Sequence, residues 1–403
     1  MLVDNGGVEI GSADANGRTA LHIAAINGHL DVVSLLLARG AAVTAQDKQQ
    51  YTPLVIAAYY SRDHNVARLL LNQGARVDEC DECNWTALHC AASEGHLRTA
   101  RLLLGRGASI TARTDRHATP LIVAAFKGRE NIVRLLLDEG ADIEECDEWS
   151  QTSLDHAAEQ GYLGIVTLLL ERGASISPRT KWGSTPLTTA ASRGREDIVR
   201  LLLDKGAHIE ECEEMGWTSL HCAAKGGHLD TARLLLEHAA SVSARTKQQA
   251  TPLTIAADNG RERIVRLFLE KDAHVEGCDD SSEAGWTALH FAAEKGYLGI
   301  ASLLLERGAS VSARNNNQST PLTVAAKNGR EDVVLLLLEK GAHIEECDER
   351  SWTSLHLAAD MGHHVLVTLL LERGASICAR NKWRDTPLMI AASKGRETIV
   401  RLL

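Results

Sequence analysis

The chain has 403 residues, of which 44% are apolar and only 4% aromatic, and its formal net charge is −10 at pH 7. This negative charge disfavours a nucleic-acid partner, because phosphates attract a basic protein face. No run of the sequence approaches the ~20 apolar residues that a helix needs to cross a bilayer. The first residues, Met1-Leu2-Val3-Asp4-Asn5, do not resemble a signal peptide. We therefore expect a cytoplasmic protein without membrane insertion.

Threonine recurs along the chain at almost constant intervals. The twelve members are Thr19, Thr52, Thr86, Thr119, Thr152, Thr185, Thr218, Thr251, Thr287, Thr320, Thr353 and Thr386. Nine of the eleven intervals are 33 residues, one is 34 and one is 36. A period in this range predicts a stack of small supersecondary units instead of one closed globular core. Such an open array favours binding over catalysis.

The unit that begins at Thr185 shows the predicted elements in chain order. Thr185 can cap a helix, Pro186 suits its first position, and apolar residues follow until Gly194 breaks the helix. A second, more apolar helix comes next, and Gly206 ends it. The polar residues beyond this glycine must then turn the chain back as a hairpin-like finger, which leads to the next threonine.

This helix–turn–helix–finger unit resembles the ankyrin repeat. The residues that carry the resemblance are Thr19-Ala20-Leu21-His22-Ile23-Ala24-Ala25, Gly28-His29, Val32-Val33, Leu35-Leu36-Leu37 and Gly40-Ala41. The pattern recurs twelve times and covers essentially all of residues 1–403. The resemblance implies an all-α repeat solenoid, a curved stack whose concave side of fingers and first helices binds other proteins. It implies no enzyme activity and no cofactor.

The units depart from the family pattern in alternation. The histidine of the first helix is present in His22, His89, His221, His290 and His356, whereas Asp155 replaces it in one unit and other residues replace it in every second unit. We therefore interpret the building block as a 66-residue pair of repeats. Residues 1–13 resemble the tail of a preceding repeat, 14–386 form successive repeats, and 387–403 resemble a truncated last repeat. We expect the chain to be a fragment of a longer protein.

The cysteines do not predict a disulfide framework. Five of the nine recur with the paired repeat: Cys80, Cys146, Cys212, Cys278 and Cys347. Helical layers lie ~8–10 Å apart, so cysteines two repeats apart are too distant to bridge, and we expect a reduced, intracellular protein. The pair at Cys80 and Cys83 has the spacing of half a zinc site, but no second pair completes it. We predict no metal site.

The fingers alternate between acidic and basic character. The charged residues that we select as candidates for partner contacts are Arg113, Arg179, Lys181, Arg245, Lys247, Glu148, Glu214 and Glu349. The structural alternative is that neighbouring fingers pair their charges, each exposed pair contributing at most ~1 kcal/mol, and both roles can coexist. We expect the finger acids to be solvated, which suits them poorly to acid–base catalysis.

All seven tryptophans lie in predicted fingers. Trp85, Trp217, Trp286 and Trp352 directly precede the repeated threonine, whereas Trp149, Trp182 and Trp383 lie two residues earlier, nearer the tip. Indoles are favoured at binding hot spots, but each ring can also fold over its own finger or first helix. We favour the folded-over interpretation for the first four, and the other three are our main candidates for contacts. The finger between Cys278 and Trp286 is three residues longer, which indicates either a binding-face insertion or drift in a tolerant loop.

The predicted function is that of a monomeric interaction scaffold or adaptor that binds other proteins. The alternative from another class is a targeting arm of a larger enzyme or channel, such as a ubiquitin ligase, an acyltransferase or an ion channel. In that case the catalytic or membrane part lies outside this sequence.

Overall fold

The computed structural model describes residues 9–61, 63–279 and 285–403. These ranges contain twenty-four helices and one short two-stranded sheet. The chain divides into two compact units: the first extends to Pro186 and includes Asp204–Ala207, and the second comprises Leu187–Leu203 and His208–Leu403. In the described residues, no helix combines the length and apolarity required to cross a bilayer.

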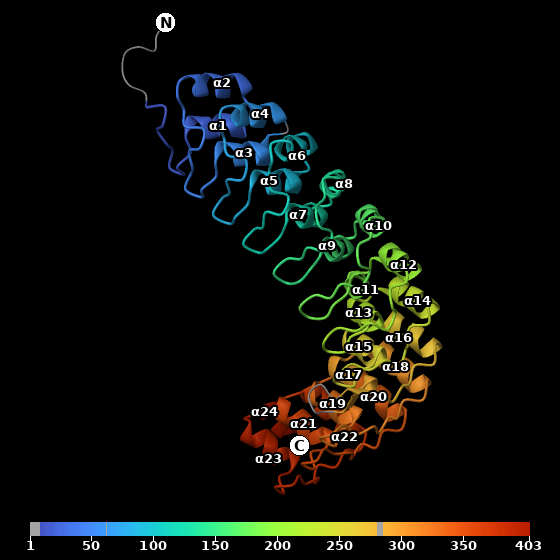
Figure 1. Ribbon diagram of the computed structural model, residues 1–403. Helices are drawn as coiled ribbons and strands as arrows, with labels where there is room; N and C mark the ends of the chain where they lie inside the picture. The colour runs from blue at the N-terminus through green and yellow to red at the C-terminus, as the bar shows by residue number, and fades with distance from the viewer. Residues whose placement is uncertain (1–8, 62, 280–284) are drawn as a thin grey trace. The chain divides into compact units, whose positions relative to one another are not determined.

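The first unit contains five repeats, each with two antiparallel helices and a finger. Its first helices are α1 (Ala20–Ile26), α3 (Pro53–Tyr60), α5 (Ala87–Glu94), α7 (Pro120–Phe126) and α9 (Ser153–Gln160). Its second helices are α2 (Leu30–Ala38), α4 (His64–Asn72), α6 (Leu97–Leu104), α8 (Glu130–Asp138) and α10 (Leu163–Glu171). Successive first helices pack side by side in one row and successive second helices in another (Figure 1).

The second unit repeats the same design. Its first helices are α11 (Pro186–Ser192), α13 (Ser219–Gly226), α15 (Pro252–Asp258), α17 (Ala288–Lys295), α19 (Pro321–Lys327), α21 (Ser354–Met361) and α23 (Pro387–Ser393). Its second helices are α12 (Glu196–Asp204), α14 (Leu229–Glu237), α16 (Glu262–Glu270), α18 (Leu298–Glu306), α20 (Glu331–Glu339), α22 (His364–Glu372) and α24 (Glu397–Leu402). The predicted all-α repeat solenoid is confirmed.

Short β pairings close the base of the fingers. Strands β1 (Cys278–Asp279) and β2 (Trp286–Thr287) are antiparallel, with Cys278 opposite Thr287. Equivalent cysteine–threonine pairs form isolated bridges in other fingers, for example between Cys80 and Thr86. The insertion predicted in this longer finger falls on residues 280–284, outside the described residues.

The repeated threonine begins the first helices, as predicted. The Thr52 side chain accepts a hydrogen bond from the N–H of Val55, and Pro53 occupies the first helical turn. In the histidine-containing repeats, the ring completes the cap: Nδ1 of His89 accepts from the Thr86 N–H at 3.2 Å. Nε2 of the same ring donates to a carbonyl oxygen of the next finger, that of Ala118, at 3.1 Å. Each such histidine therefore fixes two successive repeats.

Burial determines the protonation state of these histidines. It lowers the pKa values of His89, His221 and His290 to about 4, and it outweighs the opposing effect of the backbone carbonyls that accept from each ring. The rings are therefore neutral at pH 7, which leaves one nitrogen free to accept and the other to donate. Around them, small alanines such as Ala91 and Ala92 are completely buried, which lets the first helices approach closely.

An acceptor side chain five residues before each threonine holds most of the finger turns. It accepts a hydrogen bond from the backbone N–H four residues later, and the residues concerned are Asp14, Asp47, Asp81, Thr114, Asp147, Thr180, Thr246, Asn315, Asp348 and Asn381. The expectation that the finger acids are solvated is wrong for four of them, which are buried: Asp47, Asp81, Asp147 and Glu346. The three aspartates are the internal acceptors that their turns need. Backbone hydrogen bonds also join adjacent fingers, for instance from Glu148 N–H to the Arg116 carbonyl at 2.9 Å.

Candidate functional site

Neighbouring fingers of the first unit pair their charges. Arg113 forms an ion pair with Glu145 and also donates to the Cys146 carbonyl at 3.1 Å, while Arg116 Nε lies 3.9 Å from Glu148 Oε1. These contacts agree with the structural interpretation of the alternating charge. Glu148 is half-buried, and the other charged candidates are exposed: Arg113, Arg179, Lys181, Arg245, Lys247, Glu214 and Glu349. Exposed ion pairs of this kind contribute at most ~1 kcal/mol each. Because so little free energy is lost when such a pair opens, these charges can exchange it for a contact with a partner.

The seven tryptophans fall into two groups. Those next to the threonine are half-buried and pack against the histidine four residues later, with ring centroids 6.0 Å apart for Trp85 and His89. Trp217, Trp286 and Trp352 make the same contact with His221, His290 and His356. Among the tip tryptophans, Trp182 is 54% exposed and Trp383 is 59% exposed, whereas Trp149 is half-buried.

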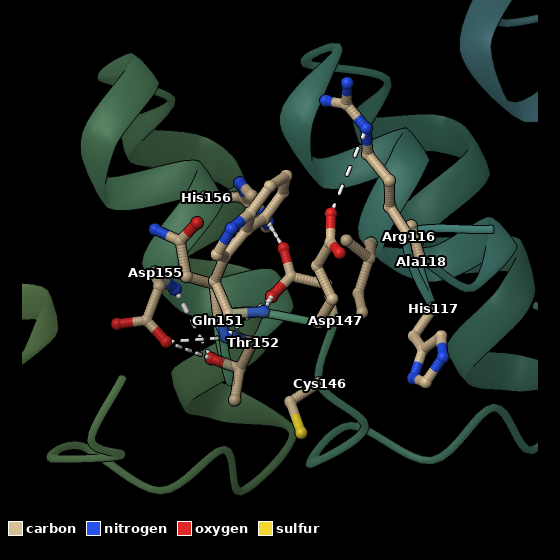
Figure 2. Close-up of polar contacts among 12 residues, drawn as sticks. Arg116, His117, Ala118, Cys146, Asp147, Gln151, Thr152, Asp155 and His156 are labelled. Carbon is tan, nitrogen blue, oxygen red and sulfur yellow. Dashed lines mark hydrogen bonds and ion pairs between the residues drawn. The ribbon is translucent and has the colours of Figure 1, made fainter. Parts of the chain in front are cut away.

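The buried carboxylate of Asp147 holds the finger that carries Trp149, and its contacts with Gln151 and His156 are drawn in Figure 2. Asp147 Oδ1 accepts from the backbone N–H groups of Trp149 and Gln151, each at 2.9 Å, and Oδ2 accepts from His156 Nε2 at 2.9 Å. Burial alone would raise the pKa of Asp147, but the hydrogen bonds from His156, Gln151 and Trp149 outweigh it and keep this pKa below its usual value. One carboxylate therefore positions both the finger and a ring of α9.

Asp155 occupies the position that histidine holds in five other repeats. Its Oδ2 accepts from the N–H and the hydroxyl of Thr152 at 2.9 and 2.8 Å, so the cap of α9 is preserved. Its Oδ1 is buried and has no hydrogen-bond partner. Burial raises the pKa of Asp155 to about 6, although Thr152 and His156 act in the opposite direction. This repeat therefore carries a buried acid where its relatives in the chain carry a neutral imidazole.

A hollow of about 430 Å³ lies beside Trp149, between three consecutive fingers and the helices α7 and α9. The rings of Phe126 and His156 meet edge to face at 5.5 Å and line one side. Ile122 and Val123 are among its apolar lining residues, which also include Trp85. This volume falls within the ~300–1,000 Å³ typical of ligand pockets. We call it the Phe126 pocket.

Sequence reasoning missed Phe126, His156 and Asp147 as members of one site. A signal was present for two of them, because His156 and Phe126 depart from the other repeats at a fixed position, whereas Asp147 occupies a position that holds Asp in four other repeats. Four residues after the threonine the chain otherwise has Ile, Val, Leu, Phe, Cys or Thr, so His156 stands out. At the position seven residues after the repeated threonine, only Phe126 and Tyr59 are aromatic. These two departures belong to adjacent repeats, and their rings meet edge to face.

The arrangement is suited to binding apolar and charged groups. Within the described ranges, no cluster of three or more potential ligands could hold a metal ion, and all nine cysteines are free. Cys90 is completely buried in α5, and burial raises the pKa of its thiol far above the usual value, so this residue is a core side chain. What the site offers is a preorganised apolar hollow with cations at its edge.

A family model described as ankyrin repeats (3 copies) matches the chain along its whole length. The matched segments are residues 1–81, 39–114, 60–147, 111–180, 154–246, 241–315, 311–381 and 344–403. These overlapping segments agree with the succession of helix pairs and fingers in both units.

Individual proteins resemble short stretches of the chain. A "Probable E3 ubiquitin-protein ligase XBOS31" of Oryza sativa subsp. japonica is 46% identical over 79 residues, 19% of this chain and 18% of that protein. "SH3 and multiple ankyrin repeat domains protein 1" of Homo sapiens is 34% identical over 91 residues, 23% of this chain and 4% of that protein. A "Putative ankyrin repeat protein" of Rickettsia bellii (strain RML369-C) is 34% identical over 75 residues, 19% of this chain and 41% of that protein. Each match covers less than half of the relative's length.

Proposed function

This chain belongs to the ankyrin repeat family, and from that premise we propose that it is a non-catalytic scaffold or adaptor that binds other proteins through its fingers and first helices. The exposure of Trp182 and Trp383, at 54% and 59%, is the observation that carries the proposal. An exposed indole leaves a large apolar surface in water, and its burial against a partner stabilises a complex.

The charged fingers provide the specificity of the proposed surface. Arg179, Lys181, Arg245 and Lys247 lie in fingers without acidic clusters, whereas Glu214 and Glu349 lie in acidic ones. Exposed charges on a rim accelerate the encounter with a complementary partner and exclude partners of the wrong charge. The tryptophans would then supply most of the affinity and the charges most of the selectivity.

A capture experiment tests this function. The chain is immobilised, and bound proteins from a cell lysate are quantified by mass spectrometry against a Trp182→Ala/Trp383→Ala variant. We expect specific partners to be lost with this variant. The matched control replaces Leu35 and Val365, which are 55% and 51% exposed on the second helices α2 and α22, with serine. If the control loses the same partners, or the tryptophan variant retains them all, the proposed surface is wrong.

A second candidate function is a targeting arm of a larger protein. The observation that favours it is that the rice relative is named as a ubiquitin ligase although the match covers 18% of its length. An immunoblot of source cells with an antibody to this chain separates the two functions. The band is excised and its peptides are identified by mass spectrometry: peptides of a catalytic or membrane domain beside those of this chain support the arm, and their absence supports the adaptor.

We further propose that the protein is cytoplasmic and monomeric. The free cysteines suit a reducing compartment, in which disulfides do not persist. Fractionation of source cells checks the location, and light scattering of the purified chain checks the oligomeric state. Recovery in a secreted fraction, or a mass near twice 43.6 kDa, would contradict the respective proposal.

A further inference from the structure

A second hollow, of about 300 Å³, lies among the fingers that precede α1, α3 and α5. Four of its lining residues are aromatic: Tyr51, Tyr59, Tyr60 and Trp85. Only 4% of the chain is aromatic and it has five tyrosines in all, so three of the five gather around one hollow. We call it the Tyr51 pocket.

The tyrosines of this pocket belong to the repeat in which the period is broken. The step from Thr52 to Thr86 is 34 residues long, and eleven repeats have glycine nine residues after the threonine where this one has Ser61. Without the glycine, α3 continues one residue further than α7 or α15 and ends at Tyr60 instead of Tyr59. The irregular repeat thus places two consecutive aromatic residues in the last turn of its first helix.

The rings of the pocket differ in orientation and in exposure. The centroids of Tyr59 and Tyr60 are 4.8 Å apart, and their planes meet at 71°. Both of these rings are exposed, whereas Tyr51 and Trp85 are half-buried, and Trp85 is held against His89. The face of an aromatic ring carries partial negative charge, so a hollow lined by several rings attracts a cation.

The charged residues of the pocket also favour a cation. Arg18 and Asp81 both line it, but Arg18 Nε forms an ion pair with Oδ2 of the buried Asp47 at 3.4 Å. The three groups together carry a charge of −1. Asp81 Oδ1 accepts hydrogen bonds from the backbone N–H groups of Cys83 and Trp85, and such neutral donors leave the charge of the carboxylate in place.

The titratable side chains of the pocket respond to this negative charge. Burial raises the pKa of Tyr51, and the charge of Asp81 and a hydrogen bond with its carboxylate raise it further. Burial likewise raises the pKa of Tyr59, and the charge of Glu94 adds to the effect. Burial raises the pKa of the Cys83 thiol, and three acids, with Asp81 the strongest, outweigh one arginine in raising it further.

Two further arginines lie outside the pocket. A separate hollow beyond the two exposed tyrosines is lined by Glu94, Arg98 and Arg129. Arg129 Nε donates to the carbonyl oxygen of Ser93 at 2.7 Å, and neither arginine is among the residues that line the Tyr51 pocket. Within the described residues, Arg18 is therefore the one cation in the lining, and it is paired.

The pocket suits a methylated ammonium better than an unmodified one. The carboxylate of Asp81 already accepts from two backbone N–H groups and is hydrogen-bonded to Tyr51. An unmodified lysine ammonium is strongly hydrated, and its three N–H donors need acceptors when it leaves water. Methylation replaces these donors with apolar groups and keeps the positive charge, so the cation loses less hydration and still gains from the rings.

We propose that the Tyr51 pocket binds the trimethylammonium group of a methylated lysine side chain in a partner polypeptide, with four aromatic rings around the cation and Asp81 as its counter-charge. The inference rests on the proposed function and names one chemical group that the first unit recognises. A hollow of about 300 Å³ is at the lower limit for ligand sites and takes only the head group. The exposed rings of Tyr59 and Tyr60 then contact the methylene stem that leads back to the partner backbone.

The test uses the full chain labelled with 5-fluorotryptophan, in which a Trp85→Phe variant assigns the signal of Trp85. The peptide probes are acetyl-Gly-Lys-Gly-amide with trimethyllysine, with unmodified lysine, and with a neutral isostere in which carbon replaces the charged nitrogen. We expect the trimethyllysine probe to shift the Trp85 signal and to leave those of Trp182 and Trp383 unchanged. The other two peptides should each bind about tenfold more weakly, because one lacks the charge and the other must be dehydrated.

Choline separates the two sources of a trimethylammonium group. It has the same head group but lacks the apolar stem of lysine, so we expect it to bind at least about fivefold more weakly than the trimethyllysine probe. Choline that binds as tightly as this probe would assign the pocket to a free small cation and overturn the proposal. A neutral isostere that binds as tightly would overturn it too, since the pocket would then select apolar groups without regard to charge.

Two variants locate the binding in the pocket. Tyr60→Ala changes an exposed residue and should weaken the trimethyllysine probe about fivefold or more, whereas the matched control Tyr162→Ala, at another exposed tyrosine, should not. Asp81→Asn removes the charge and keeps an acceptor for the turn, as Asn315 and Asn381 do in their fingers. It should weaken the trimethyllysine probe several-fold and leave the neutral isostere unchanged.

Circular dichroism confirms that each variant is folded. Unchanged affinity of the trimethyllysine probe in Tyr60→Ala and in Asp81→Asn would overturn the proposal. So would an equal loss for the charged and the neutral probe in Asp81→Asn, because a purely structural role of Asp81 predicts that result.

The outcome is distinguishable from failure of the proposed function. If lysate partners depend on Trp182 and Trp383 but the trimethyllysine probe does not shift the Trp85 signal, the chain is a scaffold and the Tyr51 pocket is not a recognition site. If the probe binds as expected but capture does not depend on those two tryptophans, the pocket stands and the proposed finger-tip surface fails.

Discussion

Trp149 and Trp383 occupy the same position of the repeat, yet one indole is half-buried and the other is 59% exposed. Their finger turns are equivalent. Asp147 accepts from the N–H groups two and four residues later, and Asn381 does the same for Trp383 and Asp385 at 2.9 Å. Local backbone structure therefore does not explain the difference.

The neighbouring side chains do explain it. Where the first region has Phe126 on the preceding first helix, the other has Asp360, which pairs with Lys394 at 3.3 Å. Where the first has His156 on its own first helix, the other has Ile390. Phe126 and His156 line one hollow together with Trp149, and neither ring has a counterpart in the repeats around Trp383. The comparison teaches that the same finger can present tryptophan as an exposed contact or as the wall of a pocket.

We expect the largest effect on stability from substitutions that remove the acceptor side chain of the finger turn in each of the two regions. Asp147→Ala leaves His156 and two backbone N–H groups without their acceptor, and we expect a loss of about 3–5 kcal/mol in the free energy of unfolding. The matched control is Asn381→Ala, which removes the same turn contacts but no histidine partner, with a loss of about 1–2 kcal/mol. Urea denaturation measures both. Equal losses would show that the contact with His156 contributes nothing to stability.

Asp155, which lies next to His156, should make the stability of the region around Trp149 depend on pH. The region around Trp383 has Met389 at the equivalent position and lacks this dependence. The folded-state pKa of Asp155, about 6, lies above its usual value of 3.8, so its contribution to stability is present below pH 3.8 and is lost as pH rises through 6. We therefore expect Asp155→Thr to stabilise the chain by about 2–3 kcal/mol at pH 8 and very little at pH 4.

Thr254 provides the matched control for this substitution, because it forms the same cap with Thr251 in α15. The reverse change, Thr254→Asp, should destabilise the chain at pH 8 and much less at pH 4. Urea denaturation at the two pH values checks both variants. A gain for Asp155→Thr that is independent of pH would contradict the assigned ionisation.

In the histidine-containing repeats, the contribution of the ring to stability has the opposite pH dependence. The folded-state pKa of His221, about 4, lies below its usual value of 6.5, so its stabilisation is present above pH 6.5 and is lost as pH falls through 4. We expect His221→Thr to remove about 2 kcal/mol of the stability difference between pH 7.5 and pH 5. Denaturation at these two pH values measures it. An unchanged pH dependence would mean that other groups account for the acid sensitivity.

The smallest effect concerns the indoles themselves. Removing Trp149 exposes Phe126 and the pocket walls, and Trp149→Ala should cost about 1–2 kcal/mol of stability. Trp383→Ala should change stability by less than about 0.5 kcal/mol, because its ring is mostly in water. Thermal melts compare the two variants. If Trp383→Ala is as destabilising as Trp149→Ala, its ring packs on the protein in solution.

The sequence by itself determined the repeat period, the two helices of each unit, the threonine caps and the half-buried state of the four tryptophans next to threonine. These features depend on residues within a few positions of one another, so a single repeat contains the information. His89, for example, belongs to the same cap as Thr86, and its neighbour Trp85 packs on it.

Only the tertiary structure decided which tip tryptophan is covered and which finger acids are buried. Phe126, Trp149 and His156 are as many as 30 residues apart in sequence, and they meet because successive repeats stack in register. Asp147 is held by contacts within its own repeat, because its carboxylate accepts hydrogen bonds from the finger turn and from the His156 ring of the following helix. The covering of Trp149 depends on a neighbour from the adjacent repeat, and a periodic sequence does not specify which departures from the period will face one another until the repeats are packed.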